Sequence, residues 1–216
     1  MKRTFDFAVA LIGLIVLSPL LVATAILIKL TTPGPMFFQQ ERVGRGFRAF
    51  KILKFRTMVH EAHKLGGQLT VCEDPRITSV GRVLRTTKID ELPQLINVVR
   101  GEMSFVGPRP EVPRYVEMFR EDYEQVLMVR PGITDLASLE YRHESELLEL
   151  SDDPERTYIA EILPEKVALA KEYIRRSSFW FDLRLIVRTV LRMAESGRST
   201  GTPCRHKSHA HDCEQD

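Results

Sequence analysis

The sequence has few cysteines and little net charge. Its 216 residues include only Cys72, Cys204 and Cys213, an odd number at wide spacing. A disulfide framework needs an even number of closely spaced cysteines, so a small disulfide-rich secreted fold is excluded and a reducing compartment is favoured. The formal net charge of +2 provides no global positive field, which argues against a nucleic acid partner.

One long stretch lacks charge altogether. The residues from Phe7 to Ile28 include no Asp, Glu, Lys or Arg, and basic residues flank them, Lys2 and Arg3 before and Lys29 after. As a helix this stretch would extend about 33 Å, enough to cross a hydrocarbon core of about 30 Å. A signal peptide would have a shorter apolar core and a small-residue cleavage site, and neither is evident. We therefore predict a membrane segment at residues 1–32.

Ser18 and Pro19 lie near the middle of this segment. Proline removes a backbone hydrogen bond and tends to kink a helix, and a serine hydroxyl can serve the backbone groups that are left unpaired. Basic residues on both flanks draw both ends toward the cytoplasm. A bent helix that enters and leaves on one face satisfies both observations, but these residues alone leave a kinked spanning helix equally open.

Two β-prone runs follow, at Met36–Val43 and Phe47–Met58, and Gly44-Arg45-Gly46 between them predicts a β-hairpin. Residues 42–56 hold basic side chains and no acidic one, namely Arg42, Arg45, Arg48, Lys51, Lys54 and Arg56. Such a patch suits phosphate groups or anionic lipid. The functional interpretation is that the second run carries Lys54 and Arg56 toward a bound phosphate, and the alternative is a solvated charged strand.

Asp90 and Glu91 stand together before a short predicted helix. The helix is indicated by apolar residues at i, i+3, i+4 and i+7 spacing, which are Leu92, Leu95, Ile96 and Val99. Pro93 suits its first turn, and Gly101 predicts its end. A purely structural interpretation makes Asp90 the cap and Glu91 a partner of the helix dipole, worth about 0.3–2 kcal/mol.

Basic residues around this pair favour a functional interpretation. Arg85 lies upstream, Arg109 is held between prolines in Gly107-Pro108-Arg109-Pro110, and a second Arg-Pro turn offers the donors of Arg130 and Thr134. Guanidinium groups near free helix amides suit phosphate. Two carboxylates placed among them predict either a metal site or a nucleophile.

The ordered motifs DELPQL, GEMSFVGPRP and RPGIT resemble the signature of bacterial sugar transferases of the monotopic polyprenol-phosphate phosphoglycosyltransferase family. The resemblance runs from the apolar segment to about Arg142 and more loosely to Arg192. It implies a re-entrant helix broken at Ser18 and Pro19, in the bacterial inner membrane with the catalytic domain facing the cytoplasm. One motif departs from the family, because residues 135–142 read DLASLEYR where many members carry a Gly-x-Ala-Gln-Val-Asn-Gly-Arg-like run.

The resemblance also implies an activity, the transfer of sugar-1-phosphate from a nucleotide diphosphate sugar, with UDP-sugars foremost, to polyprenol phosphate. Such a step starts the assembly of glycoconjugates such as exopolysaccharide or lipopolysaccharide. It makes Asp90 the nucleophile that forms an aspartyl-phosphosugar, and it places Mg²⁺ on Glu91 together with Asp90. The predicted substrate contacts are Lys54, Arg56, Arg85, Arg109, Arg130 and Thr134. Membrane lipid is a further partner, and a homodimer is compatible with this reading.

Two other classes use the same features. A membrane-anchored, metal-dependent phosphohydrolase would employ the same carboxylates, and a non-catalytic scaffold would need them only as helix caps.

The C-terminal part holds an apolar stripe typical of a core helix or of a helix in the membrane interface. Its members are Phe179, Leu183, Ile186, Val187, Val190, Leu191 and Ala194, with Trp180 at its head and arginines off it. The membrane segment already present favours the interface. We therefore predict a mostly helical α+β protein with a re-entrant helix at 1–32, a cytoplasmic catalytic domain with a β-hairpin and interfacial amphipathic helices at 33–195, and a disordered tail at 196–216.

Overall fold

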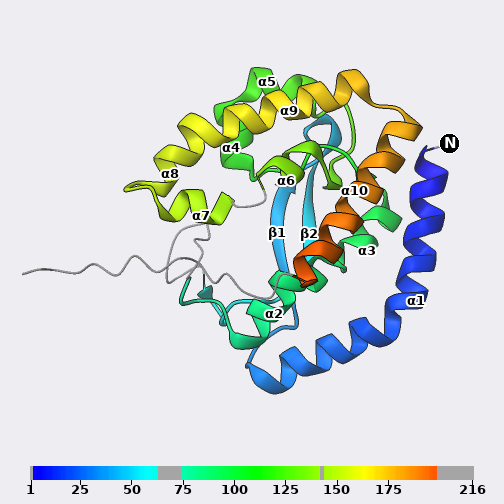
Figure 1. The fold of residues 1–216 in the computed structure, drawn as a ribbon, viewed down its shortest axis with the longest axis vertical. Helices are drawn as coiled ribbons and strands as arrows, with labels where there is room; N and C mark the ends of the chain where they lie inside the picture. Colours follow the sequence, from blue (N-terminus) through cyan, green and yellow to red (C-terminus); the bar gives the residue numbers. More distant parts are fainter. Residues whose placement is uncertain (1, 63–73, 142–143, 199–216) are drawn as a thin grey trace, which may run out of the picture.

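The computed structural model describes residues 2–62, 74–141 and 144–198, and these ranges are mostly helical with two small sheets (Figure 1). The α-helices are α1 (Lys2–Thr31), α2 (Ser79–Thr87), α3 (Gln94–Arg100), α4 (Pro113–Met118), α5 (Arg120–Val126), α6 (Leu136–Glu140), α7 (Glu144–Glu149), α8 (Pro154–Thr157), α9 (Leu163–Arg176) and α10 (Phe179–Arg198). The strands are β1 (Phe37–Val43), β2 (Ala49–Phe55), β3 (Ser104–Val106) and β4 (Gly132–Thr134). The predicted tail overlaps α10 at residues 196–198, and its remainder lies outside the described residues.

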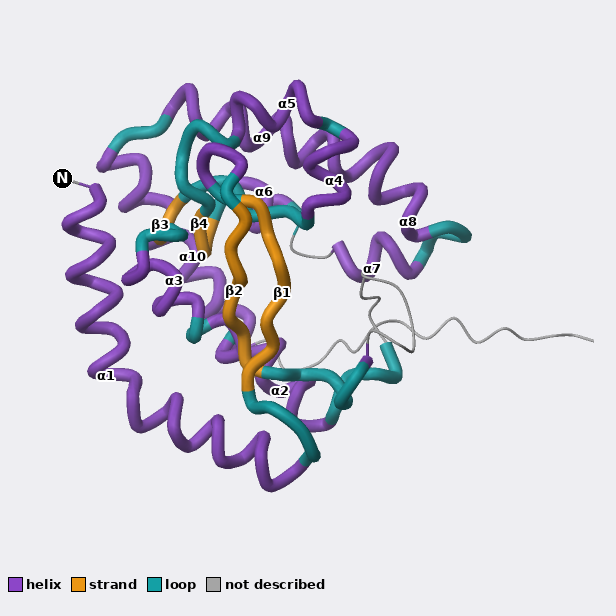
Figure 2. The backbone as a smooth tube through the Cα atoms, turned by 180° about the vertical axis from the view of Figure 1, so that it is seen from behind, coloured by secondary structure: helices purple, strands orange, loops and turns teal. Residues whose placement is uncertain are grey.

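Helix α1 is continuous but bent, and it wraps around one side of the domain (Figures 1 and 2). Pro19 lies inside it and cannot donate to the carbonyl of Ile15, four residues earlier. The Ser18 hydroxyl donates to this same Ile15 oxygen at 2.8 Å. The Ser-Pro pair therefore supplies both the break in the hydrogen-bond ladder and the donor that compensates for it.

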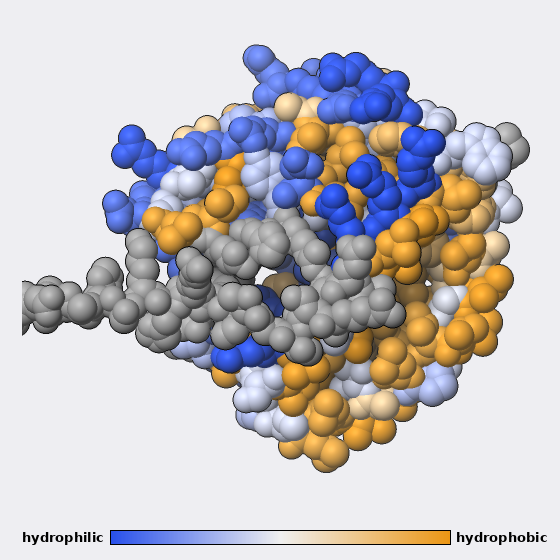
Figure 3. Space-filling view, viewed as in Figure 1, coloured by the Kyte–Doolittle hydropathy of each residue, from blue (hydrophilic) through white to orange (hydrophobic). Residues whose placement is uncertain are grey.

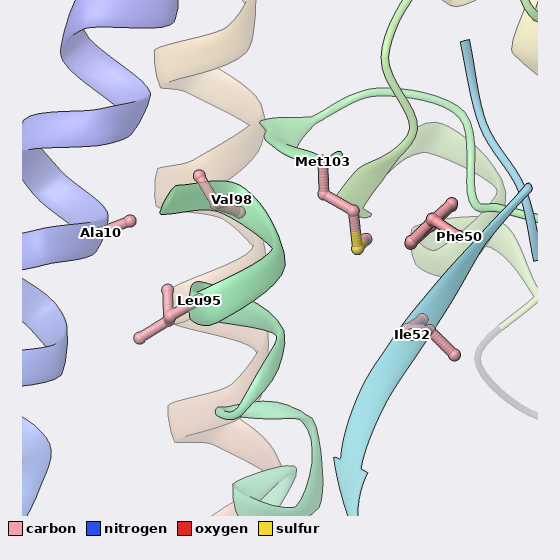
Figure 4. Close-up of a cluster of buried hydrophobic side chains, with 6 residues drawn as sticks. All are labelled: Ala10, Phe50, Ile52, Leu95, Val98 and Met103. Atoms are coloured by element: carbon pink, nitrogen blue, oxygen red, sulfur yellow. The ribbon is translucent and has the colours of Figure 1, made fainter. Parts of the chain in front are cut away.

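One side of α1 packs on the domain and the other is exposed. Ala10 is fully buried against Leu95 and Val98 of α3 (Figure 4). The outward side chains are apolar and open, with Val16 68% and Leu30 80% exposed. Apolar surface consequently follows the edge of the molecule where α1 runs (Figure 3). Among the described residues, α1 is the one helix long and apolar enough to cross a membrane.

Both ends of α1 are tied to the same globular part. Near its start, the Lys2 ammonium pairs with Asp182 of α10 at 2.6 Å, and the Arg3 guanidinium donates to the carbonyls of Val98 and Val99 at the end of α3. Just beyond its end, Arg56 donates to the Thr32 carbonyl at 3.0 Å. Both ends of the helix therefore lie against the same domain.

The predicted hairpin is confirmed. Strands β1 and β2 pair antiparallel from Phe37 with Phe55 to Val43 with Ala49, and Gly46 adopts the left-handed conformation (φ 65°) in the connection. The outer edge of β2 is covered by α3, because Asn97 accepts from the Leu53 amide at 3.0 Å and donates to the Lys51 carbonyl at 2.8 Å. The asparagine amide thus takes the place of a third strand.

The short helix after Asp90 differs from the expectation in two ways. It begins at Gln94, after a 3₁₀ turn η3 (Ile89–Glu91), and it has no side-chain cap, so capping by Asp90 was a wrong interpretation. Of the four apolar residues expected on its buried face only Leu95 is fully buried, and Gln94, Asn97 and Val98 are buried with it. The reason is that α3 packs between α1 and β2 (Figure 4) and so has two buried sides. Gly101 ends α3 with φ 84°, as predicted.

Strands β3 and β4 bring the two Arg-Pro turns together. They pair in parallel, with Ser104 opposite Gly132 and Val106 opposite Thr134. The Gly107 amide donates to the Thr134 carbonyl at 3.1 Å, and the Gly132 amide donates to the Pro108 carbonyl at 3.0 Å. The chain segments touch here because both crossing points are glycine.

Replacing Gly107 by Ala should destabilise the protein. A Cβ at this position would lie 2.3 Å from the Arg130 carbonyl oxygen, and a clash with backbone costs about 1–3 kcal/mol. The matched control is Gly13→Ala in α1, where the new Cβ meets Leu95 at an ordinary 3.5 Å and the free energy of unfolding should stay level or rise. Thermal unfolding of both variants checks this. Equal unfolding temperatures would contradict the close approach.

The described members of the apolar stripe of α10 are partly or largely exposed, and the buried Leu185 lies off that stripe. Leu185 is buried with Val106 and Tyr173, whereas Val190 and Leu191 are more than half exposed and Trp180 is 75% exposed. The stripe is therefore not the buried face of a core helix, and its contact with a membrane interface stays a prediction. The buried side of α10 packs against β3. The exposed side carries apolar residues together with the solvent-exposed Arg184 and Arg188.

Candidate active site

The turn η3 holds Asp90 and Glu91 where three distant segments meet. Glu91 Oε1 accepts from Lys54 Nζ on β2 at 2.8 Å and from Arg109 Nη2, in the turn after β3, at 2.6 Å. Lys88 immediately before the turn has φ 59°, which ends α2 and redirects the chain into η3. Three segments thus form the site: the turn after α2 carries the two carboxylates, the hairpin carries Lys54, and the first Arg-Pro turn carries Arg109.

The charges within this cluster are strongly coupled. Burial by itself raises the pKa of Glu91, but Arg109 and Lys54 outweigh it and hold that pKa well below its ordinary value. Glu91 in turn raises the pKa of Arg109, while burial lowers the pKa of Lys54. At neutral pH Glu91 is therefore an anion between two cations, and the cluster carries a net positive charge before Asp90 is counted.

Asp90 is buried, and nearby cations attract its carboxylate without a hydrogen bond to it in the described chain. Its side chain is 7% exposed, and Oδ1 makes no hydrogen bond within the described chain. Burial and the neighbouring Glu91 raise its pKa, while Lys54, Lys88 and Arg85 act in the opposite direction. An unpaired buried acceptor costs about 1–3 kcal/mol. An arrangement that disfavours the isolated carboxylate and surrounds it with cations suits a group that reacts with, or binds, something else.

Arg85 lies at the edge of the same cluster. Its Nε donates to Thr57 Oγ1 at 2.9 Å, which fixes the guanidinium plane. Burial lowers its pKa and attraction to Asp90 raises it. No hydrogen bond from its terminal nitrogens is found in the described part of the chain, so these remain for an anion.

The structure does not bring the other three predicted contacts into the cluster. The Arg56 guanidinium is used on the turn that follows α1, where it bonds the Pro33 carbonyl at 2.7 Å as well as Thr32. Arg130 Nε donates to the Gly101 carbonyl at 2.9 Å, and the Thr134 hydroxyl bonds Thr189 of α10 at 2.7 Å. Each of these three side chains hydrogen-bonds a group of the protein outside the carboxylate cluster, although its neighbours in the sequence help to form the site.

Two residues that hold the Arg109 turn, Asp135 and Arg42, were not among the predicted site residues, although Arg42 belonged to the basic patch at residues 42–56. Asp135 is 4% exposed, and its Oδ2 accepts from the Arg109 amide at 3.1 Å while Oδ1 accepts from the Ser138 amide, capping α6. Arg42 donates to the Pro110 carbonyl at 3.0 Å. Both hold the backbone of the Arg109 turn. The signal for Asp135 was its place directly after RPGIT, where the chain departs from the common family run.

Asp90 and Glu91 could hold a magnesium ion only together with other ligands, such as phosphate groups and water. Within the described ranges no group of three or more His, Cys, Asp or Glu side chains could hold a metal by itself. Mg²⁺ is commonly held by one or two carboxylates, substrate phosphates and water. The adjacent carboxylates of Asp90 and Glu91 are ligands of this kind.

Comparison with known proteins identifies the chain's relatives. A family model described as bacterial sugar transferase matches residues 1–196. The UDP-N-acetylgalactosamine-undecaprenyl-phosphate N-acetylgalactosaminephosphotransferase of Aeromonas hydrophila is 39% identical over 192 residues, 88% of this chain and 42% of that protein. The UDP-glucose:undecaprenyl-phosphate glucose-1-phosphate transferase of Escherichia coli K12 is 39% identical over 197 residues, 89% of this chain and 40% of that protein. The exopolysaccharide production protein PSS of Rhizobium leguminosarum is 38% identical over 206 residues, 92% of this chain and 97% of that protein.

Fold and site together define a domain with a bent apolar helix and a buried carboxylate pair set among cations. The chain belongs to the bacterial sugar transferase family. It spans about two fifths of the length of the first two relatives, so it corresponds to one part of those proteins.

Proposed function

We propose that this chain is a membrane-bound enzyme that transfers sugar-1-phosphate from a nucleotide diphosphate sugar, with UDP-sugars as the expected donors, to a polyprenol phosphate. The observation that carries the proposal is the unpaired, buried Asp90 carboxylate beside a Glu91 already neutralised by Lys54 and Arg109. The proposal is supported by relatives named as transferases of sugar phosphate to undecaprenyl phosphate, and by another named as an exopolysaccharide production protein.

In the first step Asp90 attacks the sugar-bearing phosphorus of the donor. The bond from this phosphorus to the bridging oxygen breaks, nucleoside monophosphate leaves, and an aspartyl-phosphosugar remains. Arg85 and Arg109 are placed to bind phosphate oxygens, and Glu91 keeps the Arg109 and Lys54 side chains in position. The raised pKa of Asp90 makes its ionised form more basic and so a better nucleophile.

In the second step an oxygen of the polyprenol phosphate attacks the same phosphorus. The acyl phosphate bond breaks, the Asp90 carboxylate is restored, and a polyprenol diphosphate sugar is formed. An acyl phosphate suits this role because it is reactive enough to be displaced again.

Mg²⁺ bound by Glu91 and Asp90 would supply positive charge where the donor's phosphates meet the carboxylate. The surrounding cations do the same from the protein side. We expect chelation of divalent ions to stop the transfer and added Mg²⁺ to restore it.

The bent helix supports a re-entrant attachment in the bacterial inner membrane with the domain on the cytoplasmic side. Each arm of α1 holds about half of its 30 residues, roughly 23 Å, which is short of a hydrocarbon core of about 30 Å. Both ends of the helix also contact one domain. Lys2 forms an ion pair with Asp182 at the start, and Arg56 donates to the Thr32 carbonyl just after the end.

Cysteine labelling tests this topology. Cysteines introduced at Thr4 and Pro35, on a background without the three native cysteines, are expected to react only from the cytoplasmic side, because both positions are exposed and lie beside the domain. Labelling of one from the cytoplasm and the other from outside would establish a spanning helix instead.

The activity is tested with a radiolabelled nucleotide sugar, polyprenol phosphate and Mg²⁺. We expect label in the lipid product and release of nucleoside monophosphate in equal amounts. A phosphohydrolase would release sugar phosphate or phosphate without a lipid product, and a scaffold would release nothing. Comparing several nucleotide sugars in this assay then identifies the donor.

A further inference from the structure

Gln94 carries an orphaned polar group next to the proposed nucleophile. Its side chain is 1% exposed, and Nε2 makes no hydrogen bond within the described chain. The other buried unpaired side-chain atoms of the described residues are Arg42 Nε, Arg56 Nε and Asp90 Oδ1. Asp90 Oδ1 is the one acceptor in this set, and Gln94 lies four residues after it. An unpaired buried amide is unfavourable, so its presence at this place calls for a physical reason.

The contacts of neighbouring residues show which side of α3 carries Gln94. Glu91 and Asn97 lie three residues before and after it, and both contact β2, Glu91 through Lys54 and Asn97 through the backbone of Leu53. Gln94 is therefore on the β2 side of α3, between the ion cluster and the Asn97 contact. Ile89–Glu91 form a 3₁₀ turn, and Leu92 and Pro93 keep right-handed helical backbone angles, so Asp90 and Gln94 lie about one turn apart on one continuous helical path.

Asn97 shows what a structural amide on this side of α3 does. Its Oδ1 accepts from the Leu53 amide, and its Nδ2 donates both to the Lys51 carbonyl and to Glu102 Oε2 at 2.7 Å. All its polar atoms are paired within the protein. Gln94, one turn earlier and as deeply buried, has no such partner for its amide nitrogen.

We propose that Gln94 is a positioning residue, whose Nε2–H donates to Asp90 Oδ1 once the donor phosphate is bound and so directs Oδ2 at the phosphorus. This inference rests on the proposed function. The two orphaned atoms are complementary, one donor and one acceptor, and hydrogen bonds of catalytic groups are often long in the empty site and close in the complex. When the second step restores the carboxylate, negative charge returns to Oδ1, and the same N–H stabilises it.

The test compares Gln94→Met with Asn97→Leu. Methionine keeps the approximate volume of glutamine but has no N–H, so the unfolding temperature should stay level or rise while kcat falls by about ten- to a hundredfold. KM for the nucleotide sugar should change less than twofold. The burst of nucleoside monophosphate released from donor alone should slow by the same factor as kcat. Asn97→Leu should lower the unfolding temperature and leave kcat per folded molecule unchanged.

A second variant, Gln94→Leu, also removes the N–H without adding a charge or another donor. The same loss of kcat with nearly unchanged KM is expected. The inference about Gln94 would be overturned if either variant had the kcat of the wild type, or if its activity fell only in proportion to the folded fraction. The proposed function would still stand in that case, provided that the wild-type protein transfers sugar phosphate in an Asp90-dependent way. Absence of lipid product with the wild-type protein would overturn the proposed function itself.

Discussion

Asp90→Asn should reduce sugar-phosphate transfer by at least about a thousandfold, because an amide cannot form the acyl phosphate. The same change should leave the fold intact. The raised pKa of Asp90 means that its ionised form is disfavoured in the folded protein, so replacing it by a neutral amide should hold the unfolding temperature level or raise it. Activity and stability are then expected to change in opposite directions.

The covalent intermediate gives this prediction a direct measurement. Wild-type protein incubated with donor alone should gain the mass of a phosphosugar on the peptide that contains Asp90, and the Asn variant should gain none. Asp153→Asn is the matched control, because Asp153 caps α8 on the surface and should keep full activity. Normal transfer by Asp90→Asn, or turnover without any added mass, would rule out the nucleophile.

Glu91→Gln should lower both stability and activity, in contrast to the change at Asp90. Removing its charge leaves Lys54 and Arg109 close together without their shared anion. Breaking a fully buried ion pair costs about 3–5 kcal/mol, and we expect about 2 kcal/mol here because the Arg109 side chain is 37% exposed. Denaturant unfolding measures the loss. The control Glu117→Gln removes an exposed pair with Arg120 and should cost less than about 1 kcal/mol.

The pH dependence of this difference identifies its cause. The pKa of Glu91 is depressed in the folded protein, so its contribution to stability is fully present above the ordinary value of 4.5 and is lost as pH falls through the depressed pKa. The gap in unfolding free energy between wild type and Glu91→Gln should therefore shrink in acid below about pH 4.5. A gap that persists where Glu91 is protonated would show that packing, not charge, is responsible.

Local sequence patterns predicted the elements whose causes are local. Gly44-Arg45-Gly46 between β-prone runs predicted the hairpin, Gly101 predicted the end of α3, and the Ser18-Pro19 pair predicted a bend. In each case one or two residues with restricted or permissive backbone geometry decide the outcome, and these residues are visible in the sequence.

Patterns that depend on two-sided packing were misjudged. Periodicity gave α3 one apolar face, whereas contact with both α1 and β2 buries the polar Gln94 and Asn97. It gave α10 one apolar stripe, whose Val187, Val190 and Leu191 stay exposed, while Leu185, which lies off that stripe, is buried in the core. A single helical pattern does not reveal how many neighbours a helix has.

By itself the sequence determined the family, through motifs in a fixed order, and the local breaks and turns that glycine and proline impose. Only the tertiary structure decided which basic residues lie beside the carboxylates. An arginine looks the same in the sequence whether its guanidinium binds a substrate or a backbone carbonyl. Arg109 and Lys54 come to Glu91 through the β3–β4 crossing and the hairpin, while Arg56 is directed to the turn after α1. These positions depend on contacts between residues far apart in the chain, and that is the information that short-range pattern does not contain.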